Sequence, residues 1–268
     1  MLDVEFAQLS DPGRVRQNNE DSIDSSLPRS EAEVRSHGWL FALADGVGGH
    51  QQGEVASKIA VESMVAGFRS AASAEPHTSL LSRLALAANA DVFETSRATG
   101  TPGAGAGMAT TLVACALRFA SAVVAHVGDS RCYLIREGTA TQLTRDHTLV
   151  NDQMRMGLIT KEDAAVSQNR HVLTRSLGNE MFVSVDTRLV ELHAGDVLLL
   201  CSDGLHGPVS GQEIAHIVTR NADLNEAARK LVAAANEKDG GDNVSVQLIR
   251  IRSVERMGLY RGRPYKLY

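Results

Sequence analysis

The sequence has no apolar run long enough to span a membrane. Its N-terminus, from Met1 to Glu5, also lacks the basic and apolar regions of a secretory signal peptide. Basic residues are not in excess: 27 Lys and Arg stand against 32 Asp and Glu, a formal net charge of −5. Proteins that bind nucleic acid usually carry a basic patch, so we expect no nucleic-acid partner. The expectation is a soluble, cytoplasmic protein without a membrane span.

Cysteine is scarce, with three residues in a chain of 268. Cys115, Cys132 and Cys201 each stand within an apolar stretch, and an odd number of cysteines cannot be fully paired. We therefore expect buried, reduced thiols rather than a disulfide framework.

Helical and strand patterns both occur along the chain. Apolar residues at spacings of three and four predict helices over about 56–68, 81–92 and 228–235. Short apolar, β-branched runs predict mostly buried strands at 39–44, 110–117, 121–127, 131–135, 196–201 and 244–251. Short turns join several of these strands, which favours antiparallel pairing. Helices in runs and strands in runs indicate an α+β fold.

Three segments depart from this regular pattern. Residues 98–107 are rich in glycine and are expected to form a mobile connector within the domain. Residues 147–172 are polar and interrupt the strands, so we expect an inserted, partly helical lobe. Residues 254–268 are a basic C-terminal tail that carries tyrosines, and the sequence leaves open whether it is ordered.

Aspartate recurs where a predicted strand meets a tight turn, at Asp45, Asp129, Asp203 and Asp242. Any one of them reads best as ordinary turn chemistry, because Asp-Gly is a common turn dipeptide. Together with the acidic pair Glu20 and Asp21, they suggest a joint site. Two carboxylates about 4 Å apart repel by roughly 4 kcal/mol at an effective dielectric of about 20, so a convergent set would need cations. Hard divalent cations prefer such oxygen ligands.

Eight short motifs carry a resemblance to a known family. In chain order they are RQNNED (16–21), ADGVGGH (44–50), MATT (108–111), HVGDSR (126–131), LTRDH (143–147), LTRSLG (173–178), SDGL (202–205) and DNV (242–244). The sequence resembles the metal-dependent protein serine/threonine phosphatases of type 2C, the PPM family, in their bacterial form. The match runs from about residue 5 to residue 251.

The resemblance implies a four-layer αββα sandwich, in which two central antiparallel sheets are flanked by helices. The phosphatase domain would cover residues 1–253, with residues 147–172 as the flap beside the active site. The tail at 254–268 lies outside the resemblance.

The resemblance also implies a role for each site residue. The implied metal-binding residues are Asp45, Gly46, Asp203, Asp242, Glu20, Asp21 and Asp129, and the implied catalytic residues are Arg16 and Asp45. Asp45 would bridge two cations and Gly46 would offer its carbonyl to one of them. Asp203 and Asp242 would bind the other cation.

The outer groups have their own implied roles. Glu20 and Asp21 would order metal-bound water, and Asp129 would join Asp203 at a weaker third metal site. Arg16 would bind the substrate phosphate, because its planar guanidinium matches phosphate oxygens.

The implied function is hydrolysis of phosphoserine and phosphothreonine on proteins by a water that bridges two Mn²⁺ or Mg²⁺ ions, without a covalent intermediate. The implied partners are phosphorylated proteins, with a bacterial serine/threonine kinase and its substrates among them. Two alternatives stay open: a catalytically weak regulatory binder with the same fold, and a hydrolase of small phosphate esters. His50, His126 and His147 are not expected to be catalytic; His126 stands in an apolar strand, where a structural role is favoured.

Overall fold

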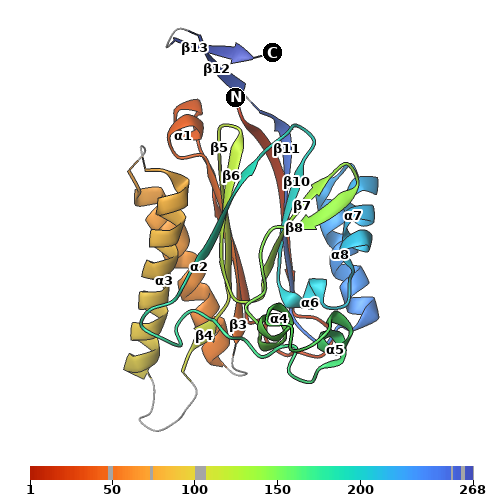
Figure 1. Ribbon diagram of the computed structural model, residues 1–268. Coiled ribbons are helices and arrows are strands. Elements are labelled where there is room, and N and C mark those ends of the chain that lie inside the picture. Colours follow the sequence, from red (N-terminus) through yellow and green to blue (C-terminus); the bar gives the residue numbers. More distant parts are fainter. Residues whose placement is uncertain (48–50, 73–74, 100–106, 255, 261–262, 268) are drawn as a thin grey trace.

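Two antiparallel sheets face each other, and helices cover the outer face of each (Figure 1). The computed structural model describes residues 1–47, 51–72, 75–99, 107–254, 256–260 and 263–267. The first sheet has the order β1 (Asp3–Asp11), β11 (Val244–Ser253), β10 (Val197–Cys201), β7 (Arg131–Arg136) and β8 (Thr139–Gln142). The second has the order β2 (Asp21–Ser26), β3 (Trp39–Val47), β5 (Leu112–Arg118), β6 (Ser121–Val127) and β9 (Asp186–Glu191), with β4 (Ala109–Thr110) beside β3. The α+β sandwich predicted from the sequence is confirmed.

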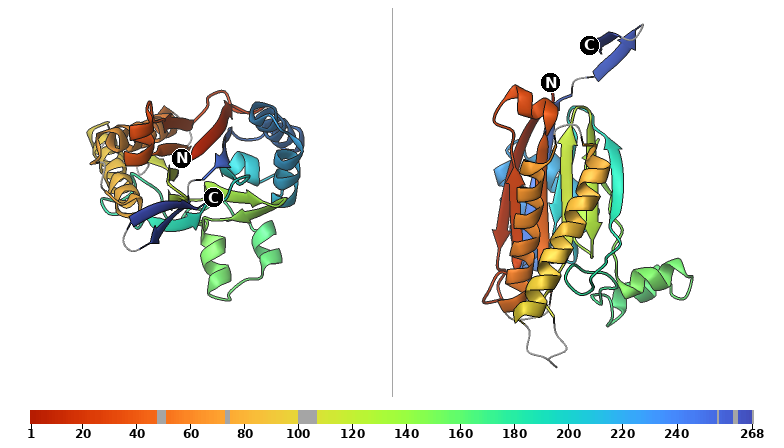
Figure 2. Two further views of the ribbon diagram at one scale, coloured as in Figure 1. Left: turned by 90° about the horizontal axis from the view of Figure 1, so that it is seen from above. Right: turned by 90° about the vertical axis from the view of Figure 1, so that its left-hand side faces the viewer.

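The helices divide between the two outer faces. α2 (Gln51–Ser70) and α3 (His77–Thr99) pack on the second sheet, whereas α7 (Gly211–Arg220) and α8 (Leu224–Lys238) pack on the first. α1 (Glu31–Ser36) and α6 (Asp203–His206) are short helices within connections. Two further short helices, α4 (Leu149–Arg155) and α5 (Lys161–Val166), stand away from the sandwich (Figure 2).

The central strands are buried on both faces, which explains their continuous apolar sequences. In β3, Leu40 and Ala42 point toward α2 and α3, whereas the alternate residues Phe41 and Leu43 point toward the facing sheet. Residues from both sheets, such as Val113 and Leu198, fill the layer between them. A strand with two buried faces has no polar alternation, and it is recognised by its length and composition instead.

The predicted helices and central strands are all present, and the edge strands were missed. The expected strand at 110–117 is divided into β4 and β5, which are separated at Thr111. The strands outermost in the two sheets, β1, β2, β8 and β9, are partly exposed and were not predicted from the sequence. Their sequences carry polar residues on the open side, so the apolar signal is diluted.

The flap is closed at its base by backbone hydrogen bonds. Leu149 N donates to Val172 O at 2.9 Å, and Thr174 N donates to His147 O at 2.8 Å. An isolated bridge joins Thr148 to Leu173. The two chain ends of the flap therefore leave the sandwich side by side.

The C-terminal tail forms a separate two-stranded sheet of β12 (Arg256–Tyr260) and β13 (Arg263–Leu267), at the end of the molecule near the N-terminus (Figure 1). The limits of the domain at 1–253, of the flap and of the tail at 254–268 stay predictions. Most of the expected connector, at 100–106, lies outside the described residues, as do Gly48, Gly49 and His50 of the second motif. Among the helices that are described, none has both the length and the apolarity needed to cross a bilayer.

The three cysteines are free and buried, as the sequence predicts. Burial raises the pKa of Cys115 and of Cys201 to about 12. The pKa of Cys132 is also raised, by burial and by its two cysteine neighbours. Because the thiolate is the reactive form, these thiols are protected both by the fold and by their protonation.

We predict that the native protein reacts with a thiol-specific chromogenic reagent at less than about one-hundredth of the rate of a free thiol, since reaction must wait for unfolding. All three thiols should react once the protein is denatured. Counting the groups modified before and after addition of denaturant tests this. Rapid modification of any thiol in the native protein would show that the core around it opens.

Candidate active site

Five aspartates meet where the two sheets open at one end of the sandwich. Asp45, near the end of β3, pairs across the strands with Asp21, the first residue of β2. Asp129 follows β6, Asp203 follows β10, and Asp242 precedes β11. In antiparallel sheets the end of one strand lies beside the start of the next, which brings these turns together. The carboxylate of Asp45 interacts electrostatically with all four others.

Burial and mutual repulsion make three of these aspartates hard to ionise. Burial, followed by repulsion from the other aspartates, raises the pKa of Asp45 well above its ordinary value. Burial also raises the pKa of Asp21 and of Asp129 to about 7. For Asp203, burial acts in the same direction, but contacts with His171, His206 and Asp45 together outweigh it and the pKa is lowered. Divalent cations would remove the repulsion and stabilise the ionised forms.

One buried oxygen of Asp21 has no hydrogen-bond partner. Oδ2 accepts a hydrogen bond from Ser202 Oγ at 2.8 Å, whereas Oδ1 is buried and accepts none from any described residue. An unsatisfied carboxylate oxygen in the interior is destabilising. Such an oxygen is a preferred ligand of Mg²⁺ and Mn²⁺, so the donor set fits hard divalent cations.

Backbone hydrogen bonds hold Asp45 in place. Its N–H donates to Thr111 Oγ1 at 2.9 Å, and its carbonyl accepts from Thr111 N and from Thr110 Oγ1, each at 2.8 Å. Thr111 Oγ1 also lies 2.7 Å from Ser130 Oγ. The two threonines of the MATT motif thus position a site residue without facing the cleft themselves. The sequence contains the motif but does not reveal this role, since the contacts join residues 65 and 66 positions apart.

Asn243 ties the N-terminal loop to the start of β11. Its Oδ1 accepts from Glu20 N at 2.8 Å, and its Nδ2 donates to the carbonyls of Pro12 and Asn18, each at 3.0 Å. Its own N–H donates to Asp242 Oδ1 at 2.9 Å. One amide side chain therefore fixes the segment that carries Glu20 relative to Asp242. No sequence pattern predicted this function for Asn243.

Gly46 occupies a position with no room for a side chain. A Cβ there would lie 2.3 Å from the carbonyl oxygen of Gly53 and 2.8 Å from that of Glu20. Gly46 N donates to Glu20 O at 3.1 Å, and Ser57 Oγ donates to the same oxygen at 2.6 Å. These contacts bring β3, α2 and the N-terminal loop together beside the aspartates. Metal binding by the Gly46 carbonyl and by Glu20 stays a prediction.

Arg16 reaches the same end of the molecule. Its Nη2 lies 3.1 Å from Asp242 Oδ2, and its Nε donates to Gly241 O at 3.3 Å. The side chain remains about half exposed, at 47%. The guanidinium is therefore beside the carboxylates and also accessible from solvent.

A cleft of about 1050 Å³ opens onto three of the five aspartates. Asp129, Asp203 and Asp242 line it from the sandwich, and residues of α4, α5 and the segment after α5 line it from the flap. The carboxylate group therefore lies at the wall of a space large enough for a side chain and its neighbours.

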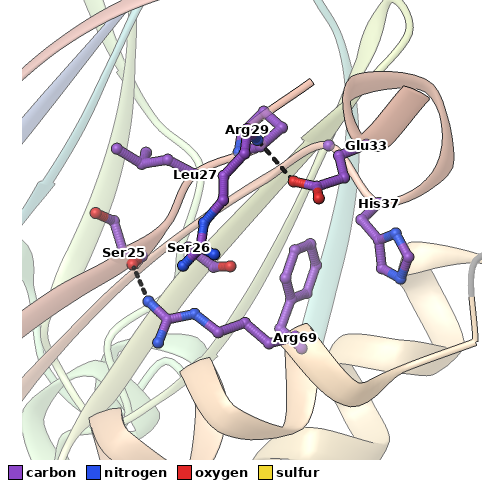
Figure 3. A pocket seen from close by; sticks show the side chains of 10 residues that line it. Ser25, Ser26, Leu27, Arg29, Glu33, His37 and Arg69 are labelled. Atoms are coloured by element: carbon purple, nitrogen blue, oxygen red, sulfur yellow. Dashed lines mark hydrogen bonds between the residues drawn. The ribbon is translucent and has the colours of Figure 1, made fainter. Parts of the chain in front are cut away.

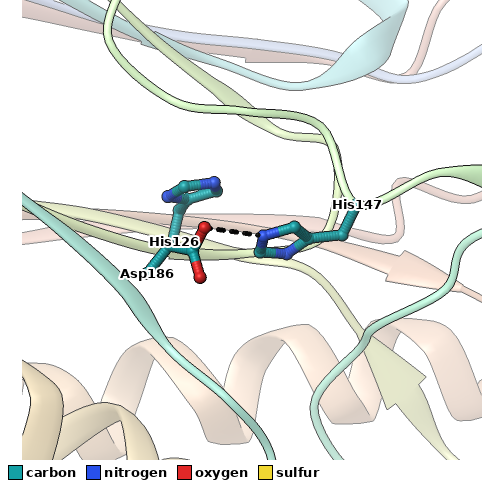
Figure 4. A group of neighbouring side chains, drawn as sticks. All are labelled: His126, His147 and Asp186. Carbon is teal, nitrogen blue, oxygen red and sulfur yellow. Dashed lines mark ion pairs between the residues drawn. The ribbon is translucent and has the colours of Figure 1, made fainter. Parts of the chain in front are cut away.

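Two histidines and an aspartate form a second cluster beneath the flap (Figure 4). His126 and His147 stack with their ring centroids 4.8 Å apart, and His147 Nε2 lies 3.3 Å from Asp186 Oδ2. Asp186 also pairs with Arg175 at 2.9 Å and with Arg145 at 3.2 Å. Two guanidinium groups already neutralise this carboxylate, which argues against a cation there.

The ring nitrogens of both histidines are engaged in structural contacts. His126 Nε2 accepts from Arg145 N at 3.1 Å and lies 2.8 Å from Arg145 O. His147 Nδ1 accepts from Gly128 N at 3.1 Å. Burial lowers the pKa of both imidazoles, to about 4 for His147, which favours neutral rings. The contacts agree with the structural role expected for His126, and His147 orients the base of the flap.

Another pocket, of about 490 Å³, lies at the opposite end of β2, by Ser25 and Ser26 (Figure 3). Arg69 Nη2 donates to Ser25 O at 3.2 Å, and Arg29 N donates to Glu33 Oε2 at 2.6 Å. Among the described residues, Glu33 is the one carboxylate that lines this pocket. Its chemistry therefore differs from that of the aspartate-lined cleft.

Comparison with known proteins decides the family. Residues 8–244 match the family described as Protein phosphatase 2C. The chain belongs to this family. It is 36% identical over 257 residues to serine/threonine phosphatase stp of Listeria welshimeri, which covers 95% of this chain and 96% of the relative.

Solved structures agree with this assignment. The serine/threonine phosphatase PstP/Ppp of Mycobacterium tuberculosis superimposes with a TM-score of 0.82 at 33% identity, covering 94% of this chain and 100% of that one. A structure of the PstP catalytic domain in complex with two manganese ions gives a TM-score of 0.79 at 33% identity, with coverages of 94% and 99%. The resemblance seen in the sequence is confirmed, and the chain is a metal-dependent serine/threonine phosphatase of the bacterial PPM type.

We predict that the stability of the metal-free protein falls as the pH rises from about 4 to about 8. Asp21 and Asp129 have pKa values near 7 in the folded protein and ordinary values of 3.8 otherwise. A raised folded pKa gives stability that is present below the unfolded pKa and is lost as the pH passes the folded pKa. The midpoint of thermal unfolding, measured in chelator between pH 5 and pH 8, tests this.

Two comparisons complete this test. Addition of Mn²⁺ should restore stability most at the higher pH, because cations compensate the ionised carboxylates. Asp21→Asn should flatten the pH dependence in chelator. Equal slopes for the wild type and Asp21→Asn would contradict the assignment of the pH effect to this aspartate.

We also predict that Gly204→Ala disturbs the site. A Cβ at Gly204 would lie 2.0 Å from Asn243 O, so the loops of Asp203 and Asp242 must move apart. Overpacking of this kind costs about 1–3 kcal/mol of stability. Mn²⁺ affinity, measured by calorimetry, should fall at least about tenfold, since one tenfold step corresponds to about 1.4 kcal/mol.

Gly211→Ala is the matched control, because a Cβ there meets nothing within 4 Å. It lies at the start of α7, where alanine is compatible with the helix. Equal Mn²⁺ affinities for the two variants would show that the close approach at Gly204 is not required for the site.

Proposed function

We propose that this chain hydrolyses phosphoserine and phosphothreonine on proteins at the cleft between the five aspartates and the flap. The observation that carries the proposal is the convergence of buried carboxylates with raised pKa values, one of which has an oxygen that accepts no hydrogen bond from the described residues. Such a group suits the binding of two divalent cations. Its position in a cleft of about 1050 Å³ suits a phosphorylated side chain.

The metal-binding residues in this proposal are those that the resemblance implies. Asp45 would bridge the two cations, with Gly46 contributing its carbonyl to one, and Asp203 and Asp242 would complete the other. When bound, two cations close together can lower the pKa of a water molecule and offset negative charge on phosphoryl oxygens. The fixed backbone at Asp45 supports this role, because three hydrogen bonds hold it in one position.

The surrounding residues have supporting roles. Glu20 and Asp21 would order the waters around the cations, and Asp129 would join Asp203 at a third, weaker site. Arg16 would bind the phosphate. One edge of its guanidinium lies against Asp242 and Gly241, which leaves Nη1 for a substrate oxygen.

The proposal also covers the identity of the cation, the kind of phosphoprotein that serves as substrate and the location of the protein in the cell. The manganese in the PstP structure supports Mn²⁺, although Mg²⁺ also suits carboxylate oxygens. The names of the bacterial relatives support proteins phosphorylated on serine and threonine as substrates. A serine/threonine kinase as the opposing enzyme, and a cytoplasmic location, are the matching expectations.

The regulatory-binder alternative is not favoured. It predicts that the chain has lost metal ligands, yet the aspartates at 45, 203 and 242 are all present and brought together. Hydrolysis of small phosphate esters alone would need no flap beside the cleft.

The test is release of phosphate from a phosphothreonine peptide, with Mn²⁺ and with chelator, by the wild type and by Asp203→Asn. We expect turnover that requires Mn²⁺ and that falls at least about a thousandfold in the variant, since the loss of a metal ligand removes several kcal/mol of transition-state stabilisation.

Asp223→Asn is the control, because Asp223 caps α8 far along the chain from the site and asparagine caps helices equally well. It should retain wild-type turnover. Folded wild-type protein that releases no phosphate with any divalent cation would refute the proposed activity.

A further inference from the structure

The cleft has one acidic wall and one basic wall. The sandwich contributes Asp129, Asp203 and Asp242, where the cations and the phosphate would bind. The flap contributes Lys161 and Arg170, and no carboxylate of α4 or α5 lines the cleft. A peptide lying between the two walls would therefore place its phosphorylated residue on one and the neighbouring residues against the other.

Other cations that line the cleft are already neutralised. Arg131 makes a bidentate pair with Asp146, its Nε lying 2.9 Å from Oδ1 and its Nη2 lying 2.6 Å from Oδ2. Arg145 pairs with Asp186 at 3.2 Å. The ammonium group of Lys238 pairs with the carboxylate of Glu213.

Lys161 and Arg170 differ from these residues. Within the described part of the chain, neither makes an ion pair, and both side chains belong to exposed residues. Glu162 and Asp163 stand in the same turn of α5 as Lys161 but do not line the cleft, so the unpaired charges that the flap presents to the cleft are those of Lys161 and Arg170.

Both cations have defined positions. Lys161 is the first residue of α5, whose start is fixed by a capping box between Thr160 and Asp163. Arg170 Nε lies 2.7 Å from His171 Nε2, and His171 Nδ1 lies 3.6 Å from Asp203 Oδ2. Arg170 is thus connected through one side chain to the aspartate group, within reach of a residue adjacent to a bound phosphoresidue.

We propose that Lys161 and Arg170 bind carboxylates on the substrate, so that the enzyme prefers phosphoproteins with acidic residues flanking the phosphorylated residue. This inference rests on the proposed function and adds a substrate class to it. The flap's apolar lining, Val150, Met154 and Ala164, lies between the two ends of the flap and adds no competing charge. Lys161 and Arg170 are specificity residues and take no part in the hydrolytic step.

The experiment compares two phosphothreonine peptides of equal length, one with Asp and Glu on both sides of the phosphothreonine and one with Gln and Asn. A small aromatic phosphate ester serves as the third substrate, because it does not reach the flap. For the wild type with Mn²⁺ we expect kcat/KM about tenfold higher on the acidic peptide, mainly through a lower KM, which is the size expected of two exposed ion pairs.

The variant Lys161→Glu/Arg170→Glu should reverse this preference and leave hydrolysis of the ester unchanged. The control variant is Arg35→Glu/Arg220→Glu, which makes the same change in net charge at exposed residues that do not line the cleft. It should keep the wild-type preference, because the effect depends on local contacts and not on total charge.

Each outcome decides the matter. Equal kcat/KM on the two peptides, or a preference that the flap variant leaves unaltered, overturns the inference while the proposed function stands. A preference lost equally in the control variant also overturns it, since total charge would then be the cause. If no substrate, including the ester, is hydrolysed, the proposed function fails and this inference fails with it.

Discussion

Repulsion among five carboxylates at one end of the sandwich is the constraint on which the rest of this structure depends. Asp45 interacts with the four others, and burial raises the pKa of Asp45, Asp21 and Asp129. Without cations the group must hold protons, whereas divalent cations would offset the repulsion and favour the ionised forms. The end of the sandwich that carries the site therefore bears an electrostatic cost, and the hydrophobic layers elsewhere must supply most of the stability of the fold.

Hydrogen bonds from neighbouring polar side chains hold the aspartates close together despite this repulsion. Thr110 and Thr111 fix the backbone of Asp45, Ser202 holds one oxygen of Asp21, and Asn243 joins the loop of Glu20 to that of Asp242. These side chains are small and largely buried, so each bond is protected from water. Geometry is thereby set before any ligand binds, which is the arrangement that favours tight and specific binding.

The sequence predicted those parts of the molecule whose residues face the interior on both sides. The strands β3, β5, β6 and β10 are continuous apolar runs because both faces are buried, so composition alone identified them. The edge strands β1, β2 and β9 were not predicted, since one side of each faces solvent and their apolar residues are sparse. For the site, the aspartates could be found because each follows or precedes a strand, and the family resemblance gathered them into one set. The positions of Asn243 and of the cations of the flap could not be predicted, because they depend on contacts between distant segments and on which charges are already paired.

The closed base of the flap has a consequence for how this fold changes over time. Two backbone hydrogen bonds and one bridge bring the two ends of the flap together, so the chain leaves and re-enters the sandwich at a single point. Closing a longer or shorter loop at such a point changes the entropy only slowly with its length. Insertions, deletions and wholesale replacement of the segment can therefore accumulate without shifting the aspartates. The sandwich and its aspartates can therefore stay unchanged while the flap varies. Substrate preference can change in this way without a change in the hydrolytic chemistry.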